Sequence, residues 1–237
     1  RLKSALRRGV AAAVIAGIVV SSGIPAYAIR WDIADGNITV KGGDESGNYN
    51  EVKQGDNAFK KDEGETVITG KSKEHTVTID TSKGNVDVTF DDLKIDVSKE
   101  GEAAVRVEGN GDVTIELDGD NELKSGGIMR VEKNELESKG TLTIKDDKGK
   151  DGSLIAEGGF GGAGIGGGIE STGSSITIRG GAVEAVGGSN AAGIGDGAGP
   201  WSEPDPDTPP SNPSNPNNII ICATPGDGQG GEADIGR

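Results

Sequence analysis

The feature that most constrains the fold is a recurring unit of three short segments. Within each segment apolar and polar residues alternate, a period of two that is typical of β-strands. The first segments align at apolar positions 27, 29 and 34 residues apart, namely Val88, Ile115, Ile144 and Ile178. The second segments begin at Leu93, Asn121, Ser153 and Ala182, and the third at Ala104, Ile128, Ala163 and Ala192. One three-segment unit therefore occurs four times in the same order.

Such a unit is too small to bury its apolar face alone. Units that stack on one another bury one continuous apolar column. The chain is therefore predicted to be all-β, a parallel β-helix solenoid of three-strand coils over residues 29–199. The alternative is a β-sandwich, which also uses short alternating strands but does not explain why the same strand order recurs.

Glycine accounts for 42 of the 237 residues, with no Gly-X-Y period, so a collagen-like structure is excluded. The richest stretch, residues 158–199, contains Gly162-x-Gly164-x-Gly166. This spacing lacks the flanking strand and helix of a dinucleotide-binding motif. Close backbone packing at the corners of a solenoid is the preferred explanation.

Residues 1–28 are predicted to be an export signal peptide. A basic start precedes an apolar run over residues 10–20, and Ala26-Tyr27-Ala28 supplies the small-x-small cleavage pattern. The alternative, a membrane anchor, needs a longer apolar stretch, and no later segment could span a membrane. The mature chain then carries 20 basic and 39 acidic residues, a formal charge of −19. We therefore expect a secreted, extracellular or cell-surface protein that does not bind nucleic acid, whose phosphates it would repel.

The composition changes abruptly after Gly199. Residues 200–218, rich in Pro, Asn, Asp and Ser, are predicted to be an extended linker. Residues 219–237 are an unassigned C-terminal tail, either a stray end or the start of a next element that is truncated here. Its Cys222 is the only cysteine, so no internal disulfide can form.

Three motifs carry a resemblance to a known family. They are the segment 117–123 (LDGDNEL), the two Ala-Gly-Ile-Gly runs that begin at Ala163 and Ala192, and the segment 176–185 (ITIRGGAVEA). Together they resemble the secreted bacterial carbohydrate-binding β-helix family of cellulose-degrading anaerobes, over residues 38–199. The resemblance implies a right-handed parallel β-helix similar to polysaccharide lyases, binding of plant-type or acidic polysaccharides, and bound calcium. Related Ala-Gly-Ile-Gly repeats also occur in bacterial surface proteins with no assigned role.

The predicted sugar-binding residues lie on the outer face of the first segments. If the four aligned apolar residues point inward, alternation directs one outward column of Thr89, Glu116, Lys145 and Arg179. Glu116, Lys145 and Arg179 are predicted to contact hydroxyls or carboxylates of a sugar chain, and Trp201 to stack on a sugar or cap the solenoid. The alternative for this column is a solvated ladder of charges.

A second outward column predicts a calcium site. Asp91, Asp118 and Asp147 would stack about 4.8 Å apart, and Asp120 could add another oxygen. A hard cation would relieve the repulsion between these carboxylates. The alternative is that the acids are turn residues, where Asp is favoured for local hydrogen bonding.

Taken together, the sequence predicts a polysaccharide-binding protein that is not an enzyme, with a cellulose- or pectin-like partner and calcium as the cofactor. A single His and a single Cys exclude the usual His/Cys zinc sites and leave little for a His-dependent triad. The alternatives are a structural or adhesive stalk of a surface protein and, third, a polysaccharide lyase with Lys145 or Arg179 as the base.

Overall fold

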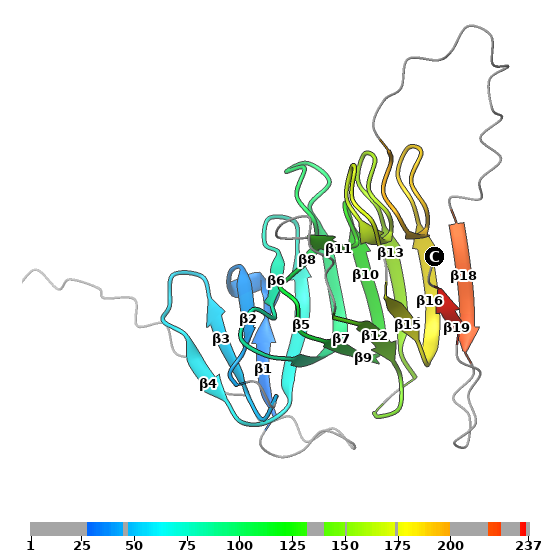
Figure 1. Ribbon diagram of the computed structural model, residues 1–237. Coiled ribbons are helices and arrows are strands. Elements are labelled where there is room, and N and C mark those ends of the chain that lie inside the picture. The colour runs from blue at the N-terminus through cyan, green and yellow to red at the C-terminus, as the bar shows by residue number, and fades with distance from the viewer. Residues whose placement is uncertain are drawn as a thin grey trace, which may run out of the picture.

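The computed structural model describes residues 28–44, 47–131, 140–149, 151–173 and 175–199, and the backbone of the strands 218–223 and 233–235. These residues form an all-β structure whose only helical segment is the 3-10 turn η1 (Ile33–Asp35). The strands form a stack that runs from the N-terminal part of the chain (blue and cyan) to the C-terminal part (yellow), and equivalent strands of successive units lie side by side (Figure 1). None of the described segments is a helix long and apolar enough to span a membrane.

The core strands form two sheets that contain three parallel ladders, and each repeating unit supplies one strand, or half of a long strand, to each ladder. Ladder 1 contains β5 (Thr66–Ser72), β7 (Val86–Asp96), β9 (Val113–Asp118), β12 (Leu142–Lys145) and β15 (Ile176–Ile178), with β1 (Ile29–Asp32) beside β5. Ladder 2 contains the second halves of β5 and β7, then β10 (Asp120–Lys124), β13 (Ser153–Glu157) and β16 (Gly181–Val186). Ladder 3 contains β2 (Ile38–Gly42), β6 (Val77–Asp80), β8 (Val105–Glu108), β11 (Ile128–Val131), β14 (Ile165–Gly167) and β17 (Ile194–Gly195). Parallel pairing of equivalent strands is not the pairing of a β-sandwich.

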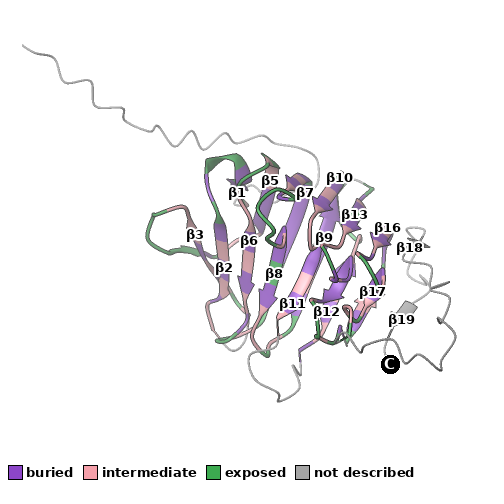
Figure 2. Ribbon diagram, turned by 90° about the horizontal axis from the view of Figure 1, so that it is seen from above, coloured by how far each residue is buried: buried purple, intermediate pink, exposed green. Residues whose placement is uncertain are grey.

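The register in ladder 1 is the predicted one. Val88 pairs with Ile115, Ile115 with Ile144, and Ile144 with Ile178. Val88 is 3% exposed and the other three are fully buried, so these four side chains point into the core as expected. Figure 2 shows buried residues along the strands and exposed ones in the connecting loops. The core is therefore the continuous apolar column that the repeat predicted.

Antiparallel strands lie at both ends of the stack. At the N-terminal end β3 (Asn50–Gln54) pairs with β2, and β4 (Lys60–Asp62) pairs with β3. At the C-terminal end β18 (Asn218–Ala223) pairs with β16, and β19 (Ala233–Ile235) pairs with β15. The C-terminal segment thus adds one strand beside ladder 2 and one beside ladder 1. The predicted signal peptide, except Ala28, and the predicted linker, except Asn218, lie outside the described residues.

The corner between ladders 1 and 2 requires a left-handed backbone. Gly70, Asp92, Gly119 and Gly181 have φ values of 92°, 53°, 66° and 81° at this corner. Glycine adopts this conformation without strain, and Asp tolerates it better than most other residues. Next to the corner, buried Asn121 accepts a hydrogen bond from the Leu93 amide (2.9 Å) and donates one to the Ser153 carbonyl (3.0 Å). This asparagine ties three consecutive units together.

Candidate functional site

A groove of about 630 Å³ crosses the outer face of ladder 1. We call it the ladder-1 groove. Its walls are residues 47–50 and 63–65 at the N-terminal end and residues 147–148 after β12. Arg179 lies at its far end. Its floor consists of the outward side chains of β7, β9 and β12, namely Asp87, Thr89, Thr114, Glu116, Thr143 and Lys145. Three of the four predicted sugar-binding residues, Glu116, Lys145 and Arg179, therefore line one groove, and Trp201 lies outside the described residues.

Glu116 is the buried acid of this groove, with 4% of its surface exposed. Its Oε1 accepts hydrogen bonds from the backbone amides of Asp147 (2.9 Å) and Lys148 (2.8 Å). Its Oε2 is buried and forms an ion pair with Lys145, whose Nζ lies 3.3 Å away. This oxygen accepts no hydrogen bond from the described residues. Burial raises the pKa of Glu116 above its usual value, against the lowering effect of the two amides.

Lys145 is held between two carboxylates. Its Nζ donates to both oxygens of Asp147, at 2.9 Å each, and faces Glu116 on the preceding strand. Burial lowers the pKa of Lys145, but the Asp147 hydrogen bonds and the charge of Glu116 outweigh it, so the pKa is raised. For Asp147, burial raises the pKa, but Lys145 outweighs it and the pKa is lowered. Lys145 is therefore held as a charged hydrogen-bond donor to Asp147.

A second outward row runs beside this charged one. Asp87, Thr114 and Thr143 pair in register on β7, β9 and β12, and all three line the groove. Their oxygens repeat at the strand spacing of about 4.8 Å. The floor thus presents hydroxyls beside charges, a surface suited to a hydroxyl-rich ligand.

The N-terminal wall is anchored by a buried polar network. Asp62 accepts hydrogen bonds from Trp31 Nε1 (3.2 Å) and Thr66 Oγ1 (2.9 Å). Asn50 donates to Thr66 Oγ1 (2.9 Å) and to the Asp87 carbonyl (2.8 Å). Burial raises the pKa of Asp62, although its hydrogen bonds lower it. Trp31 is 8% exposed, so its indole packs in the core and is not a sugar platform.

Sequence reasoning missed this wall, including Tyr49, Asn50 and Glu65. Its segment shows no period-two pattern comparable to that of the repeats. The antiparallel pairing of β3 with β2 is what brings it to the groove. We find no signal in the sequence that could have placed it there.

The four predicted calcium ligands do not gather into one cluster. Asp91 pairs in register with Asp118, and Asp91 accepts a hydrogen bond from Arg30. Asp120 accepts one from the Ser153 hydroxyl (2.9 Å), and Asp147 is bound to Lys145. The pairing of β12 with β9 ends at Lys145 with Glu116, so Asp147 lies beyond the paired strands. Among the described residues no group of three or more His, Cys, Asp or Glu side chains could hold a metal ion.

No family model, no curated protein and no solved structure matches this chain. The functional argument therefore depends on the geometry and chemistry of the ladder-1 groove.

Proposed function

We propose that residues 29–199 form a right-handed parallel β-helix that binds polysaccharide without cleaving it, as part of a secreted or cell-surface protein. Two features support the winding. The three ladders receive their strands in a fixed order, and each ladder is parallel. Connections between parallel strands of one sheet are right-handed in about 98% of cases.

The observation that carries the proposal is the ladder-1 groove itself. It spans three consecutive strands and presents hydroxyl, carboxylate and ammonium groups along its floor. A polysaccharide offers many hydroxyls at regular intervals and, in pectin-like chains, carboxylates as well. Threonine hydroxyls can accept from sugar hydroxyls, and Lys145 and Arg179 can donate to hydroxyls or carboxylates. Glu116 contributes by holding Lys145 in place.

The charge state of Lys145 favours binding over catalysis. A lyase needs a neutral base to remove a proton from the sugar, and the raised pKa of Lys145 keeps its amine protonated. Lyase activity would be detected as new absorbance from unsaturated uronates when the protein is incubated with polyuronates and calcium. The proposal predicts none.

The partner remains a cellulose- or pectin-like polysaccharide, and calcium remains the proposed cofactor. Calcium would have to bind at Asp91 and Asp118, the two predicted ligands that lie side by side in register.

The proposal is tested by affinity electrophoresis of the mature chain through gels that contain cellulose derivatives or pectin, with and without calcium. Lys145→Ala should weaken binding at least tenfold, because it removes a donor from the floor. Lys124→Ala is the matched control: this lysine also lies near two carboxylates, Glu122 (2.7 Å) and Glu157 (3.8 Å), but on ladder 2. It should bind like the unchanged protein. Absence of binding to every polysaccharide would instead favour the structural or adhesive stalk.

A further inference from the structure

The outward column of ladder 1 becomes steadily more exposed toward the C-terminal end. Val67, which pairs with Thr89, is fully buried, and Thr89 and Glu116 are each 4% exposed. The Lys145 side chain is 23% exposed, and Arg179 is exposed. The floor of the groove is therefore covered at one end and open at the other.

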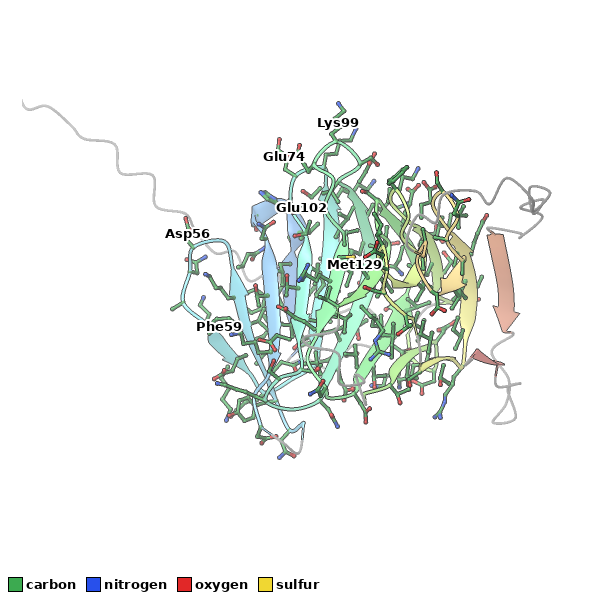
Figure 3. All side chains as sticks on the ribbon, turned by 45° about the horizontal axis from the view of Figure 1, so that its top comes forward. Asp56, Phe59, Glu74, Lys99, Glu102 and Met129 are labelled. Carbon is green, nitrogen blue, oxygen red and sulfur yellow. The ribbon has the colours of Figure 1, made fainter. Side chains whose placement is uncertain are left out.

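The cover is the segment around the β3–β4 hairpin. Residues 47–50 and 63–65 line the groove where it meets β7. Glu65 Oε1 accepts a hydrogen bond from Thr89 Oγ1 (2.7 Å), and Asn50 holds the Asp87 carbonyl. Both contacts join the cover directly to the floor strand. Figure 3 shows Asp56 and Phe59, in the turn of this hairpin, at the N-terminal end of the stack.

The closed end and the open end differ in charge. Acidic side chains lie toward the closed end, with Glu63, Glu65 and Asp87 there and Glu116 next along the floor. Basic side chains, Lys145, Lys148 and Arg179, lie toward the open end together with Asp147. The buried Glu116 Oε2 accepts no hydrogen bond among the described residues and faces Lys145 Nζ at 3.3 Å.

We infer that the ladder-1 groove binds the end of a polysaccharide chain, with the terminal sugar against the wall at the covered end. The rest of the chain leaves over Lys145 and past Arg179. This inference rests on the proposed function. It adds that the wall of residues 47–50 and 63–65 prevents a long chain from passing through.

The test is binding stoichiometry against chain length. Isothermal titration of the mature chain uses homogalacturonan fractions of short, medium and long chains and soluble cello-oligosaccharides. Binding to chain ends gives a fixed number of protein molecules per polysaccharide chain at every length. A number that grows in proportion to length overturns the inference but leaves polysaccharide binding intact. No binding to any fraction overturns both.

Blocked ends identify the bound end. One set of chains carries a bulky amine coupled to the reducing end, and another carries a methyl group on the terminal hydroxyl of the non-reducing end. One of the two modifications should weaken binding at least tenfold, equivalent to about 1.4 kcal/mol. Unchanged affinity for both overturns the inference.

A variant of the wall distinguishes loss of the barrier from a general disturbance of the β3–β4 hairpin. Tyr49→Ala removes a side chain that lines the groove and lies beneath Lys61 (4.2 Å from the ring centre). Phe59→Ala is the control, since this ring lies beneath Lys41 (4.6 Å) but does not line the groove. Tyr49→Ala should reduce the penalty for blocked ends, and Phe59→Ala should not. An unchanged penalty in Tyr49→Ala overturns the assignment of this wall as the barrier.

Discussion

Glu116 and Lys145 occupy the same outward column on neighbouring strands, and Lys145 Nζ lies 3.3 Å from the otherwise unbonded Oε2 of Glu116. The other oxygen of Glu116 accepts from two amides in the turn that follows Lys145. One carboxylate thus orients both the lysine and the loop that forms a groove wall. The groove therefore depends on a buried charge whose partner is one strand away.

This arrangement predicts an asymmetric response to loss of the lysine. Lys145→Ala leaves the Glu116 carboxylate buried without its cation, which should lower the free energy of unfolding by about 1–3 kcal/mol at neutral pH. The pKa of Glu116 should rise further, as measured by NMR titration of the carboxyl carbon. Lys124→Ala removes a more exposed ion pair, which solvent screens, and should cost less than Lys145→Ala. Equal losses in the two variants would contradict the assigned role of Glu116.

The inward register predicts the cost of truncating a core residue. Ile144→Ala should lower the free energy of unfolding by about 2–5 kcal/mol, because the side chain is fully buried. Thr143→Ala, on the outer face of the same strand, is the control and should change it by less than about 0.5 kcal/mol. Urea denaturation measures both. A loss under about 0.5 kcal/mol for Ile144→Ala would mean that the alternation is shifted by one residue.

Asp62 predicts a pH dependence of stability. Its pKa is raised by burial, so the folded chain binds this proton more readily than the unfolded chain. The free energy of unfolding should therefore gain a contribution as pH falls from neutral through the folded pKa toward the unfolded value. Asp62→Asn cannot titrate and should lose that contribution, as measured by urea denaturation at a series of pH values.

Asp96 provides the control with the opposite sign. Hydrogen bonds from Ser98 lower the pKa of Asp96, so its contribution to stability is present above the unfolded pKa and is lost as pH falls. Asp96→Asn should therefore make the protein less sensitive to acid. Shifts in the same direction for Asp62→Asn and Asp96→Asn would refute the assignment.

Calcium binding at Asp91 and Asp118 predicts a ligand-linked stability. The melting temperature should rise with the logarithm of calcium concentration above the dissociation constant, and Asp118→Asn should weaken this response. Asp96→Asn, on ladder 2, should respond like the unchanged protein. A calcium titration that leaves the melting temperature unchanged, or that is identical in Asp118→Asn, would rule out this site.

The sequence by itself determined the repeat, the strand order and the register. A position that points into the core must be apolar in every unit. The equivalent positions Val88, Ile115, Ile144 and Ile178 can therefore be aligned from the sequence alone. The same alternation placed Glu116 and Lys145 in one outward column, because side chains alternate strictly across a strand.

Only the tertiary structure decided that this column lies in a groove covered at one end. The wall segment has no periodic pattern, and its position depends on hydrogen bonds between residues far apart in sequence, such as Asn50 with Thr66 and with Asp87. Asp147 likewise lies beyond the paired strands, where its backbone amide donates to Glu116 and its carboxylate accepts from Lys145. Such contacts form between specific atoms in the folded chain, and alternation of residue types along the sequence does not encode them.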